Sequence, residues 1–300
     1  MKLNPEQSPL VSFFLATFNR KEVVKETLDM LYGQNYKKFE IVVVDNNSND
    51  GTPEMIEKCF PGVKLIKLYR NYGAIIARNI ACNNTIGEIV VSIDDDSFPG
   101  INSIVRTVEI FKENPKIGLI PFKVIDYKKY TKTQKPVIDN IGVVQNYWSG
   151  CGGAYRRDIF EKLGLWDEWG REAPFEFSVS AKSLALGYIN KSFTDIYVYH
   201  HWSSVGEAAE YRTSNLADYS GCRSTILFQF KYFPINSTLY LDLLHQLWIC
   251  IIDLYMNNRL TLIKAYFSGL FLAFNIVNHR ISLSENLAKQ LKISFNFKGR

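Results

Sequence analysis

The first two thirds of the chain alternate short apolar runs with amphipathic segments. Residues 10–16 (LVSFFLA) form an apolar run short enough for a buried strand. The next segment places four apolar residues on one helical face: Val23, Val24, Leu28 and Leu31. Gly33 follows directly after the expected end of this helix. The pattern therefore predicts a strand followed by a helix at the start of the chain.

The same alternation continues as far as residue 199. We expect further strands at 40–45, 63–68, 88–93, 117–124 and 192–199. We expect helices at 53–59, 74–83, 102–113, 158–163 and 175–186. Strands separated by short helices imply right-handed βαβ units and a mostly parallel sheet, so the fold class is α/β.

The pattern changes near Ser203, beyond which the chain has three long helical segments, at about 207–232, 239–256 and 260–279. We expect an α/β domain over residues 1–205 and a helical C-terminal region over residues 206–300.

The composition is that of a globular protein with a full core. Hydrophobic residues make up 47% of the 300 residues and charged residues 22%, which excludes extended disorder. The net charge of +5 is too small to indicate nucleic-acid binding, so we expect no nucleic-acid partner. From Asn236 onward, the chain has seven Lys and Arg and three acidic residues, so most of the surplus positive charge lies in the last part of the chain.

The five cysteines are far apart, with no CxxC pair and no Cys/His cluster in the sequence. This spacing argues against a structural zinc site or a disulfide framework and favours a reducing compartment. The first ten residues lack the apolar segment of a secretory signal, and no uncharged apolar run reaches 18 residues. We therefore expect a cytoplasmic protein that is either soluble or peripheral on the inner face of the membrane.

Three consecutive acids, Asp94, Asp95 and Asp96, follow the strand expected at 88–93. In an open α/β sheet, ligands bind at the carboxyl ends of the strands. Adjacent carboxylates repel one another unless a cation or water compensates, and hard divalent ions such as Mg²⁺ or Mn²⁺ prefer oxygen ligands. The alternative is a solvated acidic turn that caps the next helix.

Two further side chains lie where they could contact a nucleotide. Asp45 ends the strand at 40–45 and could accept a hydrogen bond from a base or a ribose, although a turn without a ligand would have the same sequence. Arg78 lies one turn into the helix at 74–83, where it could bind a phosphate. Considered alone, Arg78 would be a surface arginine.

Four segments in this order resemble the motifs of family 2 glycosyltransferases of the GT-A fold: 12–20 (SFFLATFNR), 42–52 (VVVDNNSNDGT), 71–79 (NYGAIIARN) and 88–99 (EIVVSIDDDSFP). The resemblance continues through 153–168 and Tyr199-His200-His201, covering about residues 8–203. It implies a Rossmann-like, mostly parallel sheet flanked by helices, similar to bacterial enzymes that build cell-surface polysaccharides.

The resemblance also implies a nucleoside-diphosphate sugar donor and inverting transfer to a hydroxyl of a glycan or lipid-linked glycan. Thr17 and Asp45 are expected to contact the base, and the acids correspond to the family's DxD motif. The implied donor-binding residues are Thr17, Asn19, Arg20, Asp45, Asn47, Asn71, Arg78, Asp94, Asp95, Trp148 and Gly153. The implied ligands of Mn²⁺ or Mg²⁺ are Asp94, Asp96 and His200, with Asp96 the expected direct ligand.

The family often has an acidic pair that supplies the catalytic base. Alignment back from Gly187 places Glu176 at the second acid, whereas Phe175 replaces the first and Ser178 stands where another acid is common. Glu176 is therefore the expected base, and Glu172 is the alternative if the register differs. A glutamate in a first helical turn can also merely complement the helix dipole.

The C-terminal helices have wide, aromatic-rich apolar stripes, which are common in cores and homo-oligomer interfaces. Followed by a basic tail, such stripes are also typical of helices on an anionic membrane surface.

Two other functions are compatible with the α/β pattern. A sugar-phosphate nucleotidyltransferase would be expected to have a Gly-rich loop after the first strand, and residues 15–20 (LATFNR) have none. A noncatalytic nucleotide-sugar-binding protein is suggested by the missing acids beside Glu176.

Overall fold

The computed structural model describes residues 8–127, 143–144, 151–164, 166–168, 175–201, 215–257, 260–276, 280–281, 283–284 and 287. The chain divides into two compact units. Unit 1 comprises residues 1–165 and 186–202, and unit 2 comprises residues 166–185 and 203–300.

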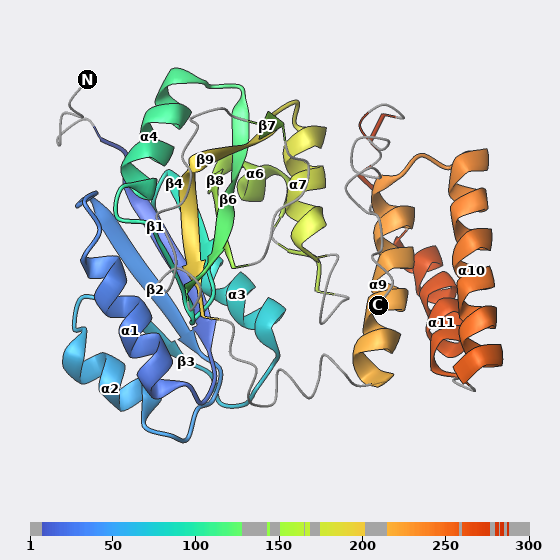
Figure 1. Cartoon of the computed structure of the whole chain (residues 1–300), viewed down its shortest axis with the longest axis horizontal. Coiled ribbons are helices and arrows are strands. Elements are labelled where there is room, and N and C mark those ends of the chain that lie inside the picture. The colour runs from blue at the N-terminus through green and yellow to red at the C-terminus, as the bar shows by residue number, and fades with distance from the viewer. Residues whose placement is uncertain are drawn as a thin grey trace. The chain divides into compact units, whose positions relative to one another are not determined.

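Unit 1 is built on a mixed sheet with the strand order β3-β2-β1-β4-β8-β6-β9-β5 (Figure 1). Its strands are β1 (Val11–Thr17), β2 (Phe39–Asp45), β3 (Lys64–Lys67), β4 (Ile89–Ile93), β5 (Ser97–Pro99), β6 (Ile117–Asp126), β7 (Val143–Val144), β8 (Gly152–Arg156) and β9 (Ile189–His200). Its helices are α1 (Lys21–Tyr32), α2 (Thr52–Cys59), α3 (Ala74–Asn83), α4 (Ser103–Glu113) and α6 (Asp158–Leu163).

The parallel half of the sheet agrees with the expected βαβ units, since β1 pairs in parallel with β2 and β4, and β2 pairs in parallel with β3. The other half is mixed. β8 runs antiparallel to both β4 and β6, and β5 and β7 run antiparallel to β9. β5, β7 and β8 were not predicted from the sequence, because β5 and β7 have only three and two residues and β8 begins with two glycines.

The first strand shows how the apolar runs form the core. Phe13 is buried in one apolar cluster with Leu28 of α1 and Ile104 of α4. The next residue, Phe14, lies on the opposite face of the strand, and its ring centroid is 6.3 Å from that of Tyr155 in β8. A strand buried on both faces has a continuous apolar sequence, as residues 10–16 do. Because β1, β2, β3 and β4 run parallel to one another, their carboxyl ends lie at the same edge of the sheet.

Unit 2 contains α7 (Phe175–Ala185), α9 (Asn215–Tyr232), α10 (Ser237–Asn257) and α11 (Thr261–Ile276). The expected domain boundary near residue 205 placed α7 with the sheet, whereas α7 is grouped with the C-terminal helices. The reason is packing, since Ala181 and Leu184 of α7 share an apolar cluster with Ile226 and Phe228 of α9. Among the described residues, no helix is both long and apolar enough to cross a membrane.

Candidate active site

The three acids after β4 have different surroundings. Asp95 is buried and accepts hydrogen bonds from Thr17 Oγ1 at 2.9 Å and from Arg20 Nη1 at 2.8 Å. Its backbone carbonyl accepts another from Thr27 Oγ1 at 2.8 Å. Burial raises the pKa of Asp95 to about 6, although the charge of Arg20 opposes the shift. Asp95 therefore joins the acidic turn to the start of α1.

Asp96 lies between a guanidinium and an imidazole. Arg20 Nη2 is 2.9 Å from Asp96 Oδ2, and His200 Nε2 is 3.1 Å from Asp96 Oδ1. Burial alone would raise the pKa of Asp96, but hydrogen bonding to His200 and the charge of Arg20 outweigh it and lower the pKa. Asp96 is therefore held as a buried carboxylate.

Asp94 is the most accessible of the three acids and forms an ion pair with Arg78 through Oδ1. Its Oδ2 lies 3.7 Å from His200 Nε2. Arg78 itself is only 8% exposed, which contradicts the alternative that it is an ordinary surface arginine. The ion pair gives this buried guanidinium a partner.

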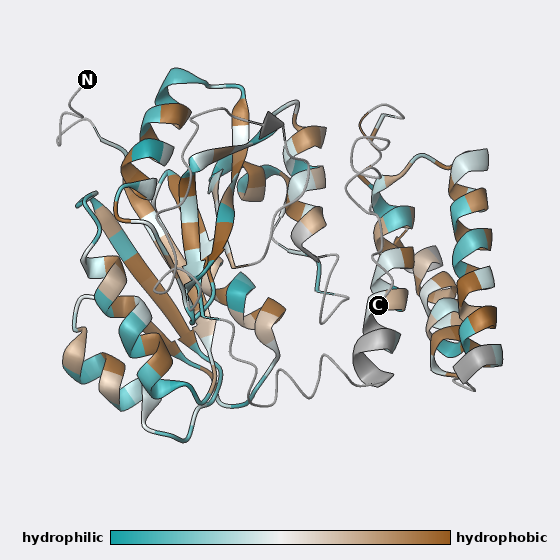
Figure 2. Ribbon diagram, in the orientation of Figure 1, coloured by the Kyte–Doolittle hydropathy of each residue, from teal (hydrophilic) through white to brown (hydrophobic). Residues whose placement is uncertain are grey.

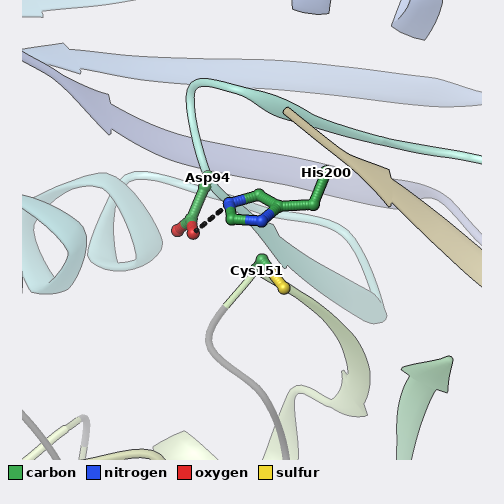
Figure 3. Close-up of side chains that lie close together, drawn as sticks. All are labelled: Asp94, Cys151 and His200. Atoms are coloured by element: carbon green, nitrogen blue, oxygen red, sulfur yellow. Dashed lines mark ion pairs between the residues drawn. The ribbon is translucent and has the colours of Figure 1, made fainter. Parts of the chain in front are cut away.

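Strand pairing brings His200 to the acids (Figure 3). Ser97 of β5 is the register partner of His200 in β9, and His201 N donates to the carbonyl of Asp96 at 2.9 Å. The neighbouring His201 has other surroundings, with Nε2 3.4 Å from Glu26 Oε1 and its ring centroid 4.2 Å from that of Tyr127. Of the two histidines, His200 therefore contacts the acidic turn through its side chain.

Asp94 and Asp96 each bring a carboxylate oxygen close to the imidazole of His200, but the described residues that place donor atoms within 4.8 Å of one another are Asp94, Cys151 and His200. His200 Nε2 lies 3.1 Å from an oxygen of Asp96 and 3.7 Å from one of Asp94. Two carboxylates and an imidazole are appropriate ligands for Mn²⁺, and the carboxylates also suit Mg²⁺. Cys151 adjoins the same place, since its sulfur, an Asp94 oxygen and a His200 nitrogen all lie within 4.8 Å of one another.

A second group of side chains lies at the ends of β1 and β2, where Thr17 and Asp45 are register partners. Asp45 is 1% exposed, and its Oδ2 accepts a hydrogen bond from Ser48 N at 2.9 Å. Within the described part of the chain, its Oδ1 is buried without a hydrogen-bond partner. A buried carboxylate oxygen without a donor is costly, so this atom is available to a ligand N–H or O–H.

Asparagines connect the loops around this sheet edge. Asn71 Oδ1 accepts hydrogen bonds from Asn46 Nδ2 at 2.8 Å and from Gly73 N at 2.9 Å. Asn19 and Asn47 have positive φ angles of 52° and 72°, a conformation that asparagine tolerates better than most residues. Asn19 Oδ1 also accepts a hydrogen bond from Asn49 N at 2.8 Å. The loops after β1, β2 and β3 are therefore held by side chains as well as by backbone.

Of the remaining predicted site residues, the structure describes the surroundings of Gly153 but not those of Trp148, Glu172 or the Glu176 side chain. Gly153 is buried in β8, paired with Ser92 of β4 and Pro121 of β6. Trp148 and Glu172 lie outside the described residues. Glu176 is the second residue of α7 in unit 2, and its side chain is also outside the description. The role of Glu176 as a base therefore stays a prediction.

Residues 12–182 match the family described as Glycosyl transferase family 2. The chain belongs to this family. One relative of this family 2 glycosyltransferase is the poly-β-1,6-N-acetyl-D-glucosamine synthase of Staphylococcus epidermidis, which is 26% identical over 183 residues. That match covers 56% of this chain and 44% of the relative. The corresponding synthase of Staphylococcus aureus is 24% identical over 181 residues, again covering 44% of its length. The matched part thus spans less than half of these curated relatives.

Two solved structures share the fold of this family 2 glycosyltransferase. Residues 1–349 of S. aureus TarS, in complex with UDP-GlcNAc, superpose with a TM-score of 0.66 at 15% identity, covering 96% of this chain and 93% of that one. Mannosyltransferase PcManGT from Pyrobaculum calidifontis, in complex with GDP-Man and Mn²⁺, gives a TM-score of 0.59 at 20% identity, covering 97% and 81%. These likenesses establish the GT-A fold that the motifs imply.

Three residues that build the site of this family 2 glycosyltransferase were not predicted from the sequence, namely Thr27, Ser97 and Cys151. Ser97 Oγ donates to the carbonyl of Cys151 at 2.6 Å and accepts a hydrogen bond from Asp94 N at 2.8 Å. The sequence signal for β5 is only the three residues after the acids, and its pairing partner, β9, is far away in the chain. Cys151 belongs to no disulfide or zinc motif of fixed spacing, so its neighbours in the sequence do not indicate its place in the site.

Proposed function

We propose that this protein transfers a sugar, with inversion, from a nucleoside-diphosphate sugar to a hydroxyl of a glycan or lipid-linked glycan, in a metal-dependent reaction. The observation that carries the proposal is the convergence of Asp94, Asp96 and His200 beside Arg78, at the edge where β1, β2 and β4 end. Family membership supports the reaction class. The ligands in the titles of TarS and PcManGT, UDP-GlcNAc and GDP-Man, are nucleoside-diphosphate sugars.

Asp94, Asp96 and His200 would hold Mn²⁺ or Mg²⁺. A bound ion would act as a Lewis acid that stabilises the negative charge of the nucleoside diphosphate as it leaves. Arg20 orients the acids, because its guanidinium contacts Asp95 and Asp96 together. Arg78, now paired with Asp94, provides a positive charge beside the expected position of the phosphates.

The base of the nucleotide is proposed to contact Asp45 and Thr17. The buried Oδ1 of Asp45, for which the described residues supply no donor, supports this assignment, since a base N–H would satisfy it. Thr17 Oγ1 already donates to Asp95, so its hydroxyl oxygen is left as an acceptor for the ligand.

Glu176 is proposed as the base that deprotonates the acceptor hydroxyl. Its place in the first turn of α7 corresponds to the family's acidic pair. Glu176→Gln should retain donor binding and lose transfer by about 10²- to 10⁴-fold, the usual effect of losing a general base. Full transfer by this variant would move the assignment to Glu172 or another residue.

Binding and product assays separate this proposal from its alternatives. We expect one of UDP, GDP and dTDP to bind with Mn²⁺ in isothermal titration calorimetry, and Asp96→Ala to abolish the metal dependence. A panel of nucleotide sugars should then release a nucleoside diphosphate in the presence of acceptor. Release of pyrophosphate from a nucleoside triphosphate and a sugar phosphate would instead indicate a nucleotidyltransferase. Metal-dependent binding without turnover would indicate a noncatalytic binding protein.

Association with an anionic membrane surface is proposed for unit 2, and the argument rests on α10. From Tyr240 to Tyr255 every exposed residue of this helix is apolar or aromatic apart from His245. These apolar and aromatic residues are Tyr240, Leu241, Leu244, Trp248, Ile249, Ile251, Ile252 and Tyr255. The acids of the same helix are turned away from water, with Asp253 buried and Asp242 partly buried. Figure 2 shows hydrophobic residues along much of α10.

Charge favours a lipid surface over a second copy of the chain as the occupant of this face. Beyond residue 256, the sequence has seven Lys and Arg and a single acid, Glu285. Lys264 is exposed on α11 and shares its side of the helix with the exposed Phe267 and Phe271. Apolar and aromatic side chains combined with basic residues match an anionic bilayer surface.

Flotation with liposomes tests this part of the proposal. We expect the protein to float with vesicles that contain anionic lipid at low salt, and Leu244→Glu combined with Trp248→Glu to reduce flotation strongly. Protein that stays in the soluble fraction under these conditions would reject the membrane surface. A concentration-dependent dimer disrupted by the same two substitutions would assign the α10 face to self-association instead.

A further inference from the structure

Cys151 lies against two of the proposed metal ligands, and the function described above gives it no role. Its sulfur, a carboxylate oxygen of Asp94 and a ring nitrogen of His200 are all within 4.8 Å of one another (Figure 3). Cys151 is 4% exposed and His200 is 6% exposed, so both side chains are held in the interior. The three residues come from three separate segments of unit 1.

The backbone around Cys151 keeps the thiol at this place. The carbonyl of Cys151 accepts a hydrogen bond from Ser97 Oγ at 2.6 Å, and Ser97 is the register partner of His200. The next residue, Gly152, pairs with Ile93 at the end of β4. A Cβ on Gly152 would lie 2.8 Å from Cγ1 of Val198, so β8 starts close against the side chains of β9. Cys151 is therefore fixed between the ends of β4 and β9.

The three side chains differ from the donor set that suits Mg²⁺. Zn²⁺ binds thiolate sulfur, imidazole nitrogen and carboxylate oxygen, whereas hard ions such as Mg²⁺ select oxygen. Zinc–ligand distances of about 2.0–2.3 Å put tetrahedral ligands about 3.5 Å apart, so these side chains need to move by only about 1 Å. Arg78 holds Oδ1 of Asp94, while Oδ2 faces His200.

We propose that Asp94, Cys151 and His200 form a zinc site that shares two of its ligands with the site for Mn²⁺ or Mg²⁺. Binding of Zn²⁺ releases the thiol proton to solvent and places a thiolate on the ion. Because Asp94 and His200 cannot serve both ions at once, Zn²⁺ competes with the ion that the donor diphosphate requires. The zinc site rests on the three side chains alone, and only the competition rests on the proposed function.

Co²⁺ provides a spectroscopic test that does not depend on activity. We expect titration of the reduced 300-residue chain with Co²⁺ to give a sulfur-to-cobalt charge-transfer band, which Zn²⁺ then removes by displacement. Cys151→Ser and Cys151→Ala should both lose the band. Cys59→Ser, at an exposed cysteine, should retain it, as should Cys222→Ser combined with Cys250→Ser. Absence of the band in the wild type, or its persistence in both Cys151 variants, would overturn the proposal.

Relative ion affinities provide a second test that does not require either variant to be fully stable. The ratio of Zn²⁺ to Mn²⁺ affinity should fall tenfold or more in Cys151→Ser and rise in Asp96→Asn, because each variant removes a ligand that only one ion uses. An unchanged ratio in Cys151→Ser would contradict the zinc site.

If Mn²⁺-dependent nucleotide binding persists without a cobalt band, only this inference fails. If a cobalt band appears without nucleotide binding, the proposed function fails instead.

Discussion

His200 Nε2, at the end of β9, lies 3.1 Å from Oδ1 of Asp96 in the turn after β4. The two residues are distant in sequence and meet because β5, which directly follows the acids, pairs antiparallel with β9. His200, the last residue of β9, is thereby placed beside the acids that follow β4. The contact joins the two halves of the sheet at the site proposed to hold the divalent ion.

Replacing His200 by alanine should weaken divalent-ion binding. The variant loses an imidazole that faces both Asp94 and Asp96, so we expect the Mn²⁺ affinity to fall by tenfold or more. Isothermal titration with Mn²⁺ measures the change. His245→Ala, at an exposed position of α10, is the matched control and should bind Mn²⁺ as the wild type does. Equal affinities in all three proteins would remove His200 from the ligand set.

Asp158 should make stability depend on pH. Burial opposes its ionisation, but hydrogen bonds from Lys162 at 2.8 Å and Tyr188 at 2.6 Å outweigh burial and lower its pKa. A carboxyl whose pKa is lower in the folded state stabilises the fold above the unfolded-state pKa of about 4, and this contribution is lost as the pH falls through the folded-state value.

Asp158→Asn should therefore cost about 1 kcal/mol of unfolding free energy at pH 7, and the cost should shrink towards zero near pH 2. Urea unfolding at the two pH values measures both differences. Asp29→Asn breaks a more exposed i,i+4 pair with Lys25 and should have a smaller effect at either pH. A penalty for Asp158→Asn that is the same at both pH values would show that the interaction does not depend on ionisation.

Gly152→Ala should destabilise unit 1, because the new methyl group would lie 2.8 Å from Cγ1 of Val198. Overpacking of this kind typically costs about 1–3 kcal/mol, and Val198→Ala in the same chain should recover part of that loss. Gly221→Ala in α9 has open space around the new Cβ and should be neutral or stabilising by up to about 1 kcal/mol. Thermal unfolding of the wild type, the three single variants and the double variant compares these values, and additive effects of Gly152→Ala and Val198→Ala would disprove the clash.

A buried ion cluster in unit 2 should make its stability sensitive to the loss of one carboxylate. Asp167 accepts hydrogen bonds from Lys231 Nζ at 2.5 Å and Tyr232 Oη at 2.6 Å, and Lys182 Nζ lies 3.4 Å from the same carboxylate. Burial lowers the pKa of Lys182, because a charged ammonium is disfavoured away from water.

Asp167→Leu leaves the buried Lys182 and the partly buried Lys231 without their carboxylate and should cost about 3–5 kcal/mol. Lys182→Met leaves Asp167 its two closer partners and should cost much less. Chemical unfolding measures both variants, and a larger cost for Lys182→Met than for Asp167→Leu would contradict this ranking of the partners.

The sequence predicted the parallel half of the sheet closely. The helix expected at 74–83 is α3 (Ala74–Asn83), and the strand expected at 40–45 differs from β2 (Phe39–Asp45) by one residue. These elements are buried on a face that their own residues specify, so local periodicity is sufficient to identify them. Asp45, Arg78 and the three acids were predicted as site residues from short motifs at the ends of these elements, whose residues are close together in the chain.

The mixed half of the sheet was not predictable in this way. β5 has only three residues, and its existence depends on pairing with β9, which lies far away in the chain. The grouping of α7 with the C-terminal helices depends on apolar partners such as Ile226 and Phe228, which no local pattern reveals. The existence of β5 and the grouping of α7 both depend on contacts between residues that are far apart in the chain.

The amino-acid sequence by itself determined the βαβ pattern, the acids after β4 and the family resemblance, because each is encoded in residues that are close together in the chain. Only the tertiary structure decided what surrounds each acid. It buried Asp95 against Thr17, placed Asp96 between Arg20 and His200, and brought Cys151 beside Asp94. The physical reason is that charge partners and metal ligands interact over a few ångströms in space, whatever their separation along the chain.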